Sequence, residues 1–271
     1  MTFIYIIAAV LLLLCGLYVL STMGRRKHPE ISQLQGWAYA HRGLYDASRP
    51  ENSMAAFRAA KKAGYGIELD VHLLADGTLA IMHDSKLKRT TGAEGRMEDL
   101  TADQLSQYYL GSTLETIPTL EQVLQLYNGE LPMIVELKVV DNNYAVLSEA
   151  VCNMLDKYPG IYALESFDPR CVRWLKQNRP DRIRGQLNQH YGKGEAPFPW
   201  ILRFLMTHQA FNFLTMPDFV AYRFCDRKVL SNFLVRKLWH VQGVTWTLKT
   251  QEDFDQAVTE GWLPIFEKFI P

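Results

Sequence analysis

Residues 66–74 have the sequence GIELDVHLL, in which apolar and polar side chains alternate. Side chains two residues apart in a β-strand point to the same side, so this alternation predicts a strand with one apolar face. Glu68, Asp70 and His72 share the opposite, polar face. Two neighbouring carboxylates repel each other unless a proton or a cation lies between them. The stretch therefore predicts both a strand and a candidate cation site.

Segments of strand and helix character alternate on both sides of this strand. The other predicted strands cover residues 37–43, 78–83, 133–139, 162–167, 182–187, 219–224 and 243–248, with residues 264–269 as a candidate closing strand. The predicted helices cover residues 51–64, 119–127, 144–158, 169–178, 228–239 and 251–260. Repeated β-α units in this number predict an α/β fold, a TIM (β/α)8 barrel over residues 37–271. An open doubly wound sheet is the alternative, and no glycine-rich nucleotide fingerprint supports it.

Two long segments exceed what a minimal barrel needs. Residues 85–117 are polar and predict a small insertion, and residues 188–217 are rich in aromatic side chains. Long connections in a compact domain are usually functional loops or inserted subdomains. Within the second segment, residues 199–214 are either a helix that packs on the barrel or a segment that lies at a membrane interface.

The first residues of the chain predict a membrane-spanning helix. Residues 2–24 carry no charged side chain and, at about 1.5 Å per residue, reach roughly 34 Å as a helix, enough to cross a bilayer core of about 30 Å. The alternative is a cleaved signal peptide, but the apolar run is long and no A-x-A cleavage site follows it. Arg25, Arg26 and Lys27 follow directly, so the positive-inside rule places the domain in the cytoplasm. Residues 25–36 form the predicted linker.

The composition excludes several classes of protein. Basic and acidic residues balance at 29 each, which gives no basic excess for nucleic acid. Of the four cysteines, Cys15 lies in the apolar helix, and the others form no C-x-x-C pair. A disulfide framework or a structural zinc site is therefore not expected.

Three carboxylates in strands predict a site for one divalent metal ion. Glu136 lies in the predicted strand 133–139, in a register that matches Glu68 and Asp70. Hard oxygen donors suit Mg²⁺ or Ca²⁺ rather than a thiolate-binding metal. The alternative is that these acids form salt bridges with Lys138 or Arg42.

Two histidines and two cations lie at the ends of these strands. His41 and His83 can act as general base and general acid, because the ordinary imidazole pKa lies near 6.5. Arg42 can bind phosphate oxygens with its planar fork, and Lys138 adds a compact positive charge.

An ordered set of motifs runs along about residues 38–270. They are AHRG at 40–43, PENS at 50–53, ELDV at 68–71, DGTLAIMHD at 76–84, LKRTTGAEG at 87–95, IPTLEQVL at 117–124, VELK at 135–138, SF at 166–167 and VTWT at 244–247. This set resembles the glycerophosphodiester phosphodiesterase family. The resemblance implies a TIM barrel with an insertion after the HD motif. It also implies metal-dependent hydrolysis of glycerophosphodiesters to glycerol 3-phosphate and an alcohol.

The resemblance also implies a role for each matching residue. The acid/base pair is His41 and His83, and the metal ligands are Glu68, Asp70 and Glu136. The substrate contacts are Arg42 and Lys138 on phosphate, Glu51 orienting Arg42, and Phe167 and Trp246 on the glycerol side. The nucleophile is either water or a neighbouring hydroxyl of the substrate. The chain end, LPIFEKFIP, departs from the family pattern, so the closing strand stays open.

The membrane helix and the aromatic segment allow two further functions. One is hydrolysis of lysoglycerophospholipids at the membrane, a lysophospholipase D-type reaction. The other is a catalytically silent barrel that binds phospholipid. The paired histidines, three acids and two cations argue against the silent barrel, because a binding module needs no acid and base.

Overall fold

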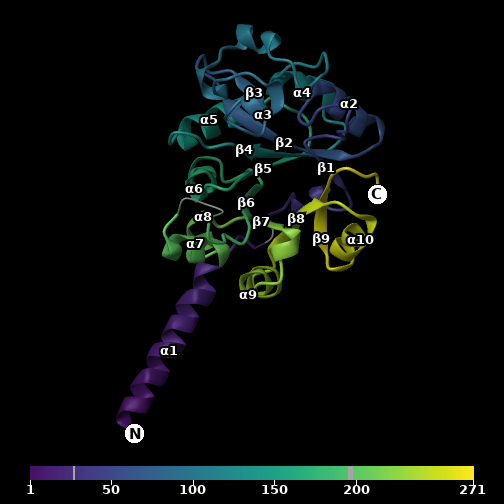
Figure 1. Ribbon diagram of the computed structural model, residues 1–271. Helices are drawn as coiled ribbons and strands as arrows, with labels where there is room; N and C mark the ends of the chain where they lie inside the picture. The colour runs from purple at the N-terminus through teal and green to yellow at the C-terminus, as the bar shows by residue number, and fades with distance from the viewer. Residues whose placement is uncertain (27, 195–197) are drawn as a thin grey trace.

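The fold is a closed parallel β-barrel surrounded by helices, with a long helix extending away from it (Figure 1). The computed structural model describes residues 1–26, 28–194 and 198–271. Lys27, one of the three predicted orienting cations, and residues 195–197 of the predicted aromatic loop lie outside the described residues.

Eight parallel strands pair in sequence order around the barrel. They are β1 (Tyr39–His41), β2 (Gly66–Leu73), β4 (Met133–Leu137), β5 (Tyr162–Ser166), β6 (Arg184–Asn188), β7 (Phe219–Arg223), β8 (Gln242–Leu248) and β9 (Trp262–Phe266). β1 pairs with both β2 and β9, which closes the barrel. The predicted TIM barrel is confirmed, and β9 is the closing strand that the sequence left open.

Helices cover the outside of the barrel, and several of them begin at a side chain that caps the helix. The covering helices are α2 (Met54–Lys62), α4 (Leu120–Tyr127), α5 (Tyr144–Leu155), α6 (Pro169–Asn178), α7 (Trp200–Thr207), α8 (Asn212–Thr215), α9 (Leu230–Phe233) and α10 (Gln251–Thr259). Ser53, Thr119 and Thr250 each accept a hydrogen bond from a backbone N–H in the first helical turn. Such caps contribute about 1 kcal/mol each by satisfying donors that the helix leaves free.

The alternation of residues 66–74 divides the core into two apolar clusters. Ile67, Leu69 and Val71 are fully buried between β2 and the covering helices. A second cluster fills the barrel interior and includes Leu34 of the short helix η1 (Ile31–Leu34), so part of the predicted linker packs into the barrel. Burying such side chains contributes about 1.5–3 kcal/mol each. Because the apolar side chains face the helices, Glu68 and Asp70 face the interior.

The predicted strand 78–83 is an antiparallel strand outside the barrel, and the small insertion follows it. β3 (Leu79–Ile81) pairs with β2, and α3 (Lys88–Thr91), η2 (Met97–Asp99) and η3 (Ala102–Gln107) follow it. These segments share an apolar cluster of their own, which includes the buried Met82, Leu87 and Met97.

Helix α1 (Thr2–Ser21) extends from the barrel with its apolar side chains exposed (Figure 1). It is long and apolar enough to cross a membrane. A signal sequence near the N-terminus would meet the same criteria of length and composition. Its last turn is attached to the barrel, because Trp239 Nε1 donates to the Val19 carbonyl and to Thr22 Oγ1, each at 3.2 Å. Arg25 then forms an ion pair with Asp218 at the start of β7.

Candidate active site

Four buried carboxyl groups lie together near the carboxyl ends of β2, β4 and β5. Asp70 pairs in register with Glu136, and Glu136 pairs with Glu165. Glu68, Asp70 and Glu136 each offer an oxygen, and these atoms lie within 4.8 Å of one another. The predicted matching register of Glu136 with Asp70 is confirmed by this pairing.

The carboxylate cluster is a site of strong charge repulsion. Burial, followed by the neighbouring negative charges, raises the pKa of Glu68 well above its ordinary value. Burial also raises the pKa of Glu136 and of Glu165. Lys138 Nζ lies 2.9 Å from Glu136 Oε1 and 3.2 Å from Asp70 Oδ1. Burial alone would raise the pKa of the Asp70 carboxyl, but Lys138, His83, Arg42 and the hydrogen bond from Asn52 outweigh it, so this pKa is lowered.

The composition of the cluster fits a hard divalent cation. Its donors are carboxylate oxygens, which Mg²⁺ and Ca²⁺ prefer, and it contains no thiol. The salt bridges that the sequence allowed as an alternative are present. Lys138 neutralises only part of the negative charge of the carboxylates, however, so these salt bridges do not balance the whole cluster. Within the described part of the chain, Glu165 Oε2 is buried and has no hydrogen-bond partner. A buried carboxylate of this kind is costly unless a cation or proton lies near it.

His41 is held by a carboxylate from the closing strand. Its Nδ1 atom lies 2.7 Å from Oε2 of Glu267, the residue after β9, and Tyr45 donates to the same oxygen at 2.7 Å. His41 Nε2 lies 3.8 Å from Glu68 Oε2. The contact with Glu267 orients the ring so that Nε2 is directed to the carboxylate cluster. Burial lowers the pKa of His41.

His83 is held in the same manner by its neighbour in the chain. Its Nδ1 atom forms a hydrogen bond with Asp84 Oδ1. Burial, with the positive charge of Lys138 next, lowers the pKa of His83 to about 4. Both imidazoles thus have one nitrogen bound to a carboxylate and the other available to the site.

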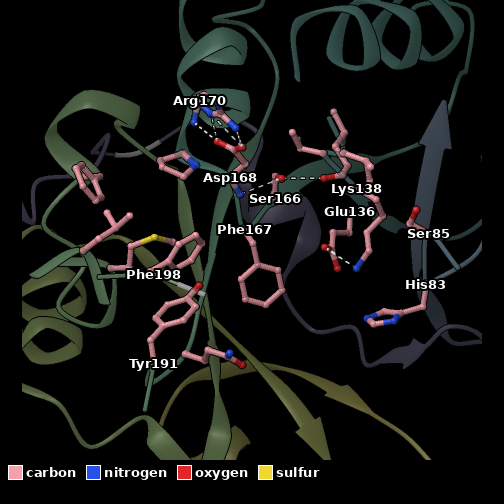
Figure 2. A pocket seen from close by; sticks show the side chains of 18 of the residues that line it. His83, Ser85, Glu136, Lys138, Ser166, Phe167, Asp168, Arg170, Tyr191 and Phe198 are labelled. Carbon is pink, nitrogen blue, oxygen red and sulfur yellow. Dashed lines mark hydrogen bonds and ion pairs between the residues drawn. The ribbon is translucent and has the colours of Figure 1, made fainter. Parts of the chain in front are cut away.

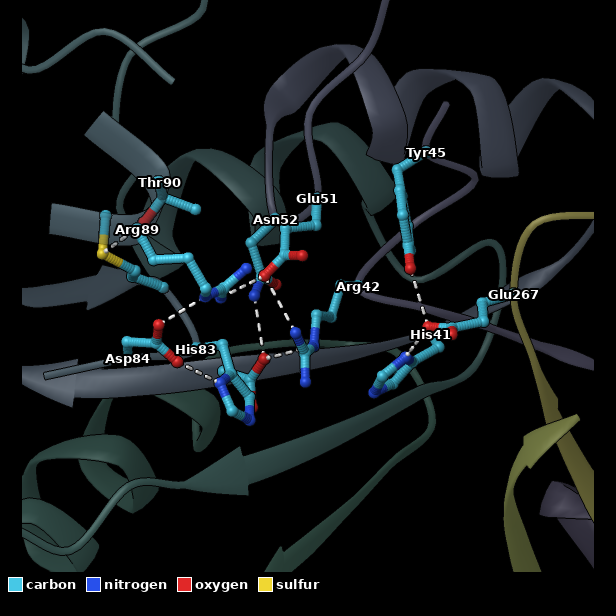
Figure 3. A network of polar contacts seen from close by, with 12 residues as sticks. His41, Arg42, Tyr45, Glu51, Asn52, His83, Asp84, Arg89, Thr90 and Glu267 are labelled. Atoms are coloured by element: carbon cyan, nitrogen blue, oxygen red, sulfur yellow. Dashed lines mark hydrogen bonds and ion pairs between the residues drawn. The ribbon is translucent and has the colours of Figure 1, made fainter. Parts of the chain in front are cut away.

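A chain of charged groups links the HRG and HD motifs (Figure 3). Arg42 donates to Glu51 Oε1 at 2.8 Å, and Arg89 of α3 donates to the same oxygen at 2.7 Å. Arg89 also donates to Asp84, which holds His83. The insertion therefore supplies the arginine that connects the two motifs.

The backbone at the end of β1 directs Arg42 toward the acids. Arg42 has a φ of 56°, and Gly43 follows with a φ of 80°. A Cβ at Gly43 would lie 2.9 Å from backbone and side-chain atoms of Ala56 in α2, so this position requires glycine. The turn places Arg42 Nε 3.4 Å from Asp70 Oδ2.

These groups line a cavity of about 470 Å³ at the carboxyl end of the barrel. Of the ten site residues that the sequence predicts, the structure brings eight to this cavity: His41, Arg42, Glu68, His83, Glu136, Lys138, Phe167 and Trp246. Asp70 lies beside it, held by Asn52 Nδ2 at 2.8 Å, and Glu51 lies behind Arg42. The Phe167 and Trp246 rings meet edge to face with centroids 5.6 Å apart.

Several polar residues of the site were not predicted from the sequence. Glu165 lies in a strand with the sequence YALES, where apolar and polar residues do not alternate, so the pattern that identified Glu68 could not find it. Arg89 lies in the stretch LKRTTGAEG at 87–95, which resembles the family, but no role was predicted for it. Glu267 lies within the candidate closing strand 264–269, but it was missed because the pairing that brings it to His41 was not known.

Comparisons with known proteins identify the family and agree with this fold. A model of the glycerophosphoryl diester phosphodiesterase family matches residues 41–257. The glycerophosphodiester phosphodiesterase 1 of Bos taurus is 30% identical over 246 residues, which cover 80% of this chain and 72% of that protein. A glycerophosphodiester phosphodiesterase of Bacillus altitudinis is 37% identical over 130 residues, 45% of this chain and 48% of that protein, so that match spans about half of each.

Solved structures share the fold. A phosphodiesterase of Oleispira antarctica, in complex with the product sn-glycerol-3-phosphate, has a TM-score of 0.69 at 22% identity, over 85% of this chain and 92% of that one. The chain belongs to the glycerophosphoryl diester phosphodiesterase family.

Proposed function

We propose that this protein hydrolyses glycerophosphodiesters to glycerol 3-phosphate and an alcohol. The observation that carries the proposal is the meeting of two carboxylate-bound imidazoles, His41 and His83, with an acidic cluster in one cavity. Family membership supports the reaction class. The Oleispira antarctica phosphodiesterase was solved in complex with its product sn-glycerol-3-phosphate, which supports the same product here.

The cations of the site bind the phosphodiester. One Mg²⁺ or Ca²⁺ held by Glu68, Asp70 and Glu136 would supply positive charge to the phosphoryl group. Lys138 and Arg42 line the cavity and contribute fixed positive charge for the non-bridging oxygens. Glu51 holds the Arg42 guanidinium in place.

The two imidazoles transfer the protons. One of His41 and His83 accepts a proton from the nucleophile as its oxygen bonds to phosphorus. The other donates a proton to the leaving oxygen as its bond to phosphorus breaks. The nucleophile is water or a neighbouring hydroxyl of the substrate, which would give a cyclic phosphate that water then opens. Phe167 and Trp246 form an apolar wall for the glycerol carbons.

The proposal is tested by release of glycerol 3-phosphate from glycerophosphocholine, with Mg²⁺ or Ca²⁺ and with EDTA. We expect EDTA to abolish release. His41→Ala and His83→Ala should each abolish turnover while the melting temperature stays close to that of the parent chain. Normal turnover in either variant would overturn the acid/base assignment.

A second candidate is lysophospholipase D-type hydrolysis of lysoglycerophospholipids, which would use the same residues. The observation that favours it is an apolar chamber that shares His83, Lys138 and Phe167 with the phosphate-binding cavity. A silent phospholipid-binding barrel would have no use for two oriented imidazoles.

The membrane topology is a proposal as well. We infer that α1 anchors the protein as a single span with the barrel in the cytoplasm. Its length and composition support the span, and Arg26 is exposed at its end. Arg25 is engaged in the fold through Asp218. A protease-protection experiment on intact inside-out and right-side-out vesicles tests the orientation. Digestion of the barrel only in right-side-out vesicles would contradict it.

A further inference from the structure

An apolar chamber of about 640 Å³ lies beside the phosphate-binding cavity. Figure 2 shows Phe167 in the middle of the chamber lining, with Tyr191 and Phe198 on one side of it and Lys138, Glu136 and His83 on the other. Phe167 lines both spaces. A small glycerophosphodiester has no group that would occupy an apolar space of this size, so hydrolysis of chain-free substrates leaves the chamber without a role.

Helix α7 forms one wall of the chamber and is apolar on two faces. Leu202 and Met206, one helical turn apart, line the chamber. Ile201 and Phe204 lie on the outer face and are each 53% exposed. A helix that is apolar all round is normally buried on every side.

The exposed face of α7 lies next to the attachment of α1. Phe204 packs on His208 with ring centroids 4.4 Å apart. The His208 ring in turn meets the Tyr18 ring of α1 edge to face, with ring centroids 6.3 Å apart. The chamber is thus one helix away from the helix that we propose crosses the membrane. Lipid chains would be the abundant apolar molecules at this position.

One polar group in the chamber is left without a partner. Tyr191 is 8% exposed and lines the chamber, and among the residues that the structure describes its hydroxyl has no hydrogen-bond partner. Burying a hydroxyl in this state is costly, so a ligand acceptor beside it would restore a lost hydrogen bond. An ester carbonyl at the head of an acyl chain is such an acceptor.

We propose that this chamber binds a single hydrocarbon chain carried by the phosphodiester substrate, with the Tyr191 hydroxyl donating to the chain's ester carbonyl. The inference rests on the proposed hydrolysis and names its substrate class. His83, Lys138 and Phe167 line both spaces, so the phosphate and the chain of one substrate can occupy them together. Each methylene buried in the chamber should raise kcat/KM by up to about fourfold.

The test uses the full chain in nanodiscs, because detergent would compete for the chamber. Choline release reports hydrolysis of both glycerophosphocholine and 1-acyl-lysophosphatidylcholines of increasing chain length. We expect kcat/KM to rise with chain length. The chain could instead be carried by the leaving alcohol rather than by glycerol. Alkyl esters of glycerol 3-phosphate test that case, and their hydrolysis is measured by the release of glycerol 3-phosphate.

Two neighbouring residues of α7 provide matched variants. Leu202→Trp fills the chamber and should lower the ratio of kcat/KM for long-chain over chain-free substrate by about tenfold or more. Ile201→Trp also replaces an aliphatic side chain of α7 by tryptophan, but on the outer face of the helix. It should leave this ratio of kcat/KM values unchanged. Equal ratios in the two variants and the parent would overturn the proposal.

Tyr191→Phe tests the polar contact separately. It should reduce the preference for an ester-linked over an ether-linked chain by about two- to tenfold, with the chain-length dependence retained. An unchanged preference removes Tyr191 from the proposal. If the parent chain hydrolyses glycerophosphocholine without any gain from a chain, the chamber assignment fails alone. If it hydrolyses none of these substrates, the proposed function itself fails.

Discussion

His41 Nδ1 lies 2.7 Å from Oε2 of Glu267, across the junction at which β1 and β9 close the barrel. The first and last strands thus jointly build one half of the proposed acid/base pair. Glu267 is 8% exposed, and Tyr45 donates to the oxygen that contacts His41. The carboxylate is therefore fixed, and it determines which imidazole nitrogen faces the substrate.

Replacing this carboxylate by an amide should impair catalysis without unfolding the protein. Glu267→Gln can turn an N–H toward His41 Nδ1, which would place the ring proton on Nε2 instead. We expect kcat to fall about tenfold to a thousandfold, with little change in KM. The control is Lys249→Met, which removes the 59% exposed outer partner of Glu267. A normal kcat in Glu267→Gln would show that His41 does not depend on this contact.

Arg89 should act as a positioning residue through Asp84 and Glu51. A lysine lacks the planar fork that reaches both carboxylates, so Arg89→Lys should lower kcat about tenfold and shift the pH profile of activity. Lys88→Met is a matched control, because Lys88 is 64% exposed and pairs only with the exposed Glu94 among described residues. Loss of melting temperature in step with activity would instead indicate a structural role.

The acidic cluster should bind a divalent cation with affinity that depends on its members. Glu68→Gln should weaken Mg²⁺ or Ca²⁺ binding more than about tenfold in titration calorimetry. Glu165→Gln is the comparison, since Glu165 lies next to Glu136 but outside the group of converging ligand atoms. A larger loss in Glu165→Gln than in Glu68→Gln would reassign the ligand set.

The ion pair between Glu260 and Arg227 should make stability depend on pH. Two hydrogen bonds from Arg227, with further donors, lower the pKa of Glu260 from an ordinary 4.5 to about 2. Because the folded-state pKa is depressed, the contribution is present above about pH 4.5 and is lost as pH falls toward 2. Glu260→Gln should cost about 0.5–1 kcal/mol of unfolding free energy at neutral pH, since Glu260 is one-third exposed.

Denaturant unfolding at several pH values measures this difference. The gap between the parent chain and Glu260→Gln should close as the pH falls. Glu149→Gln, at an exposed position of α5, should show no such closing gap. A gap that is constant with pH would contradict the assignment.

The outer face of α7 should contact lipid when the full chain is in a bilayer. Residues 1–24 contain no tryptophan, so tryptophan quenching by brominated lipids reports only on the barrel. Trp200 is 72% exposed, and Trp200→Phe should remove a large part of the quenching. Leu114→Trp, in the insertion at a position 91% exposed, should add fluorescence that brominated lipid does not quench. Unchanged quenching in Trp200→Phe would separate α7 from the membrane.

Local patterns were sufficient to predict the strands and most of the site. Alternation assigned Glu68 and Asp70 to one face, and a helix cannot produce that period. The chain end was harder, because LPIFEKFIP has no polar alternation and its partner strand lies at the other end of the sequence. Glu267 could not be recognised before that pairing was known.

Contacts between distant segments decided the remaining features. Arg89 belongs to the site only because the insertion folds back over Glu51, and α7 lies beside α1 although about 180 residues separate them. The chamber exists because several loops and a helix leave space between them, which no single segment encodes.

The sequence by itself determined the barrel strands other than the closing one, the apolar first helix and the identity of the chemical groups, because backbone periodicity and side-chain type are local properties. Only the tertiary structure decided which carboxylate holds which histidine, and that an apolar chamber adjoins the phosphate site. Those features depend on barrel closure and on long-range packing, which set distances between residues far apart along the chain.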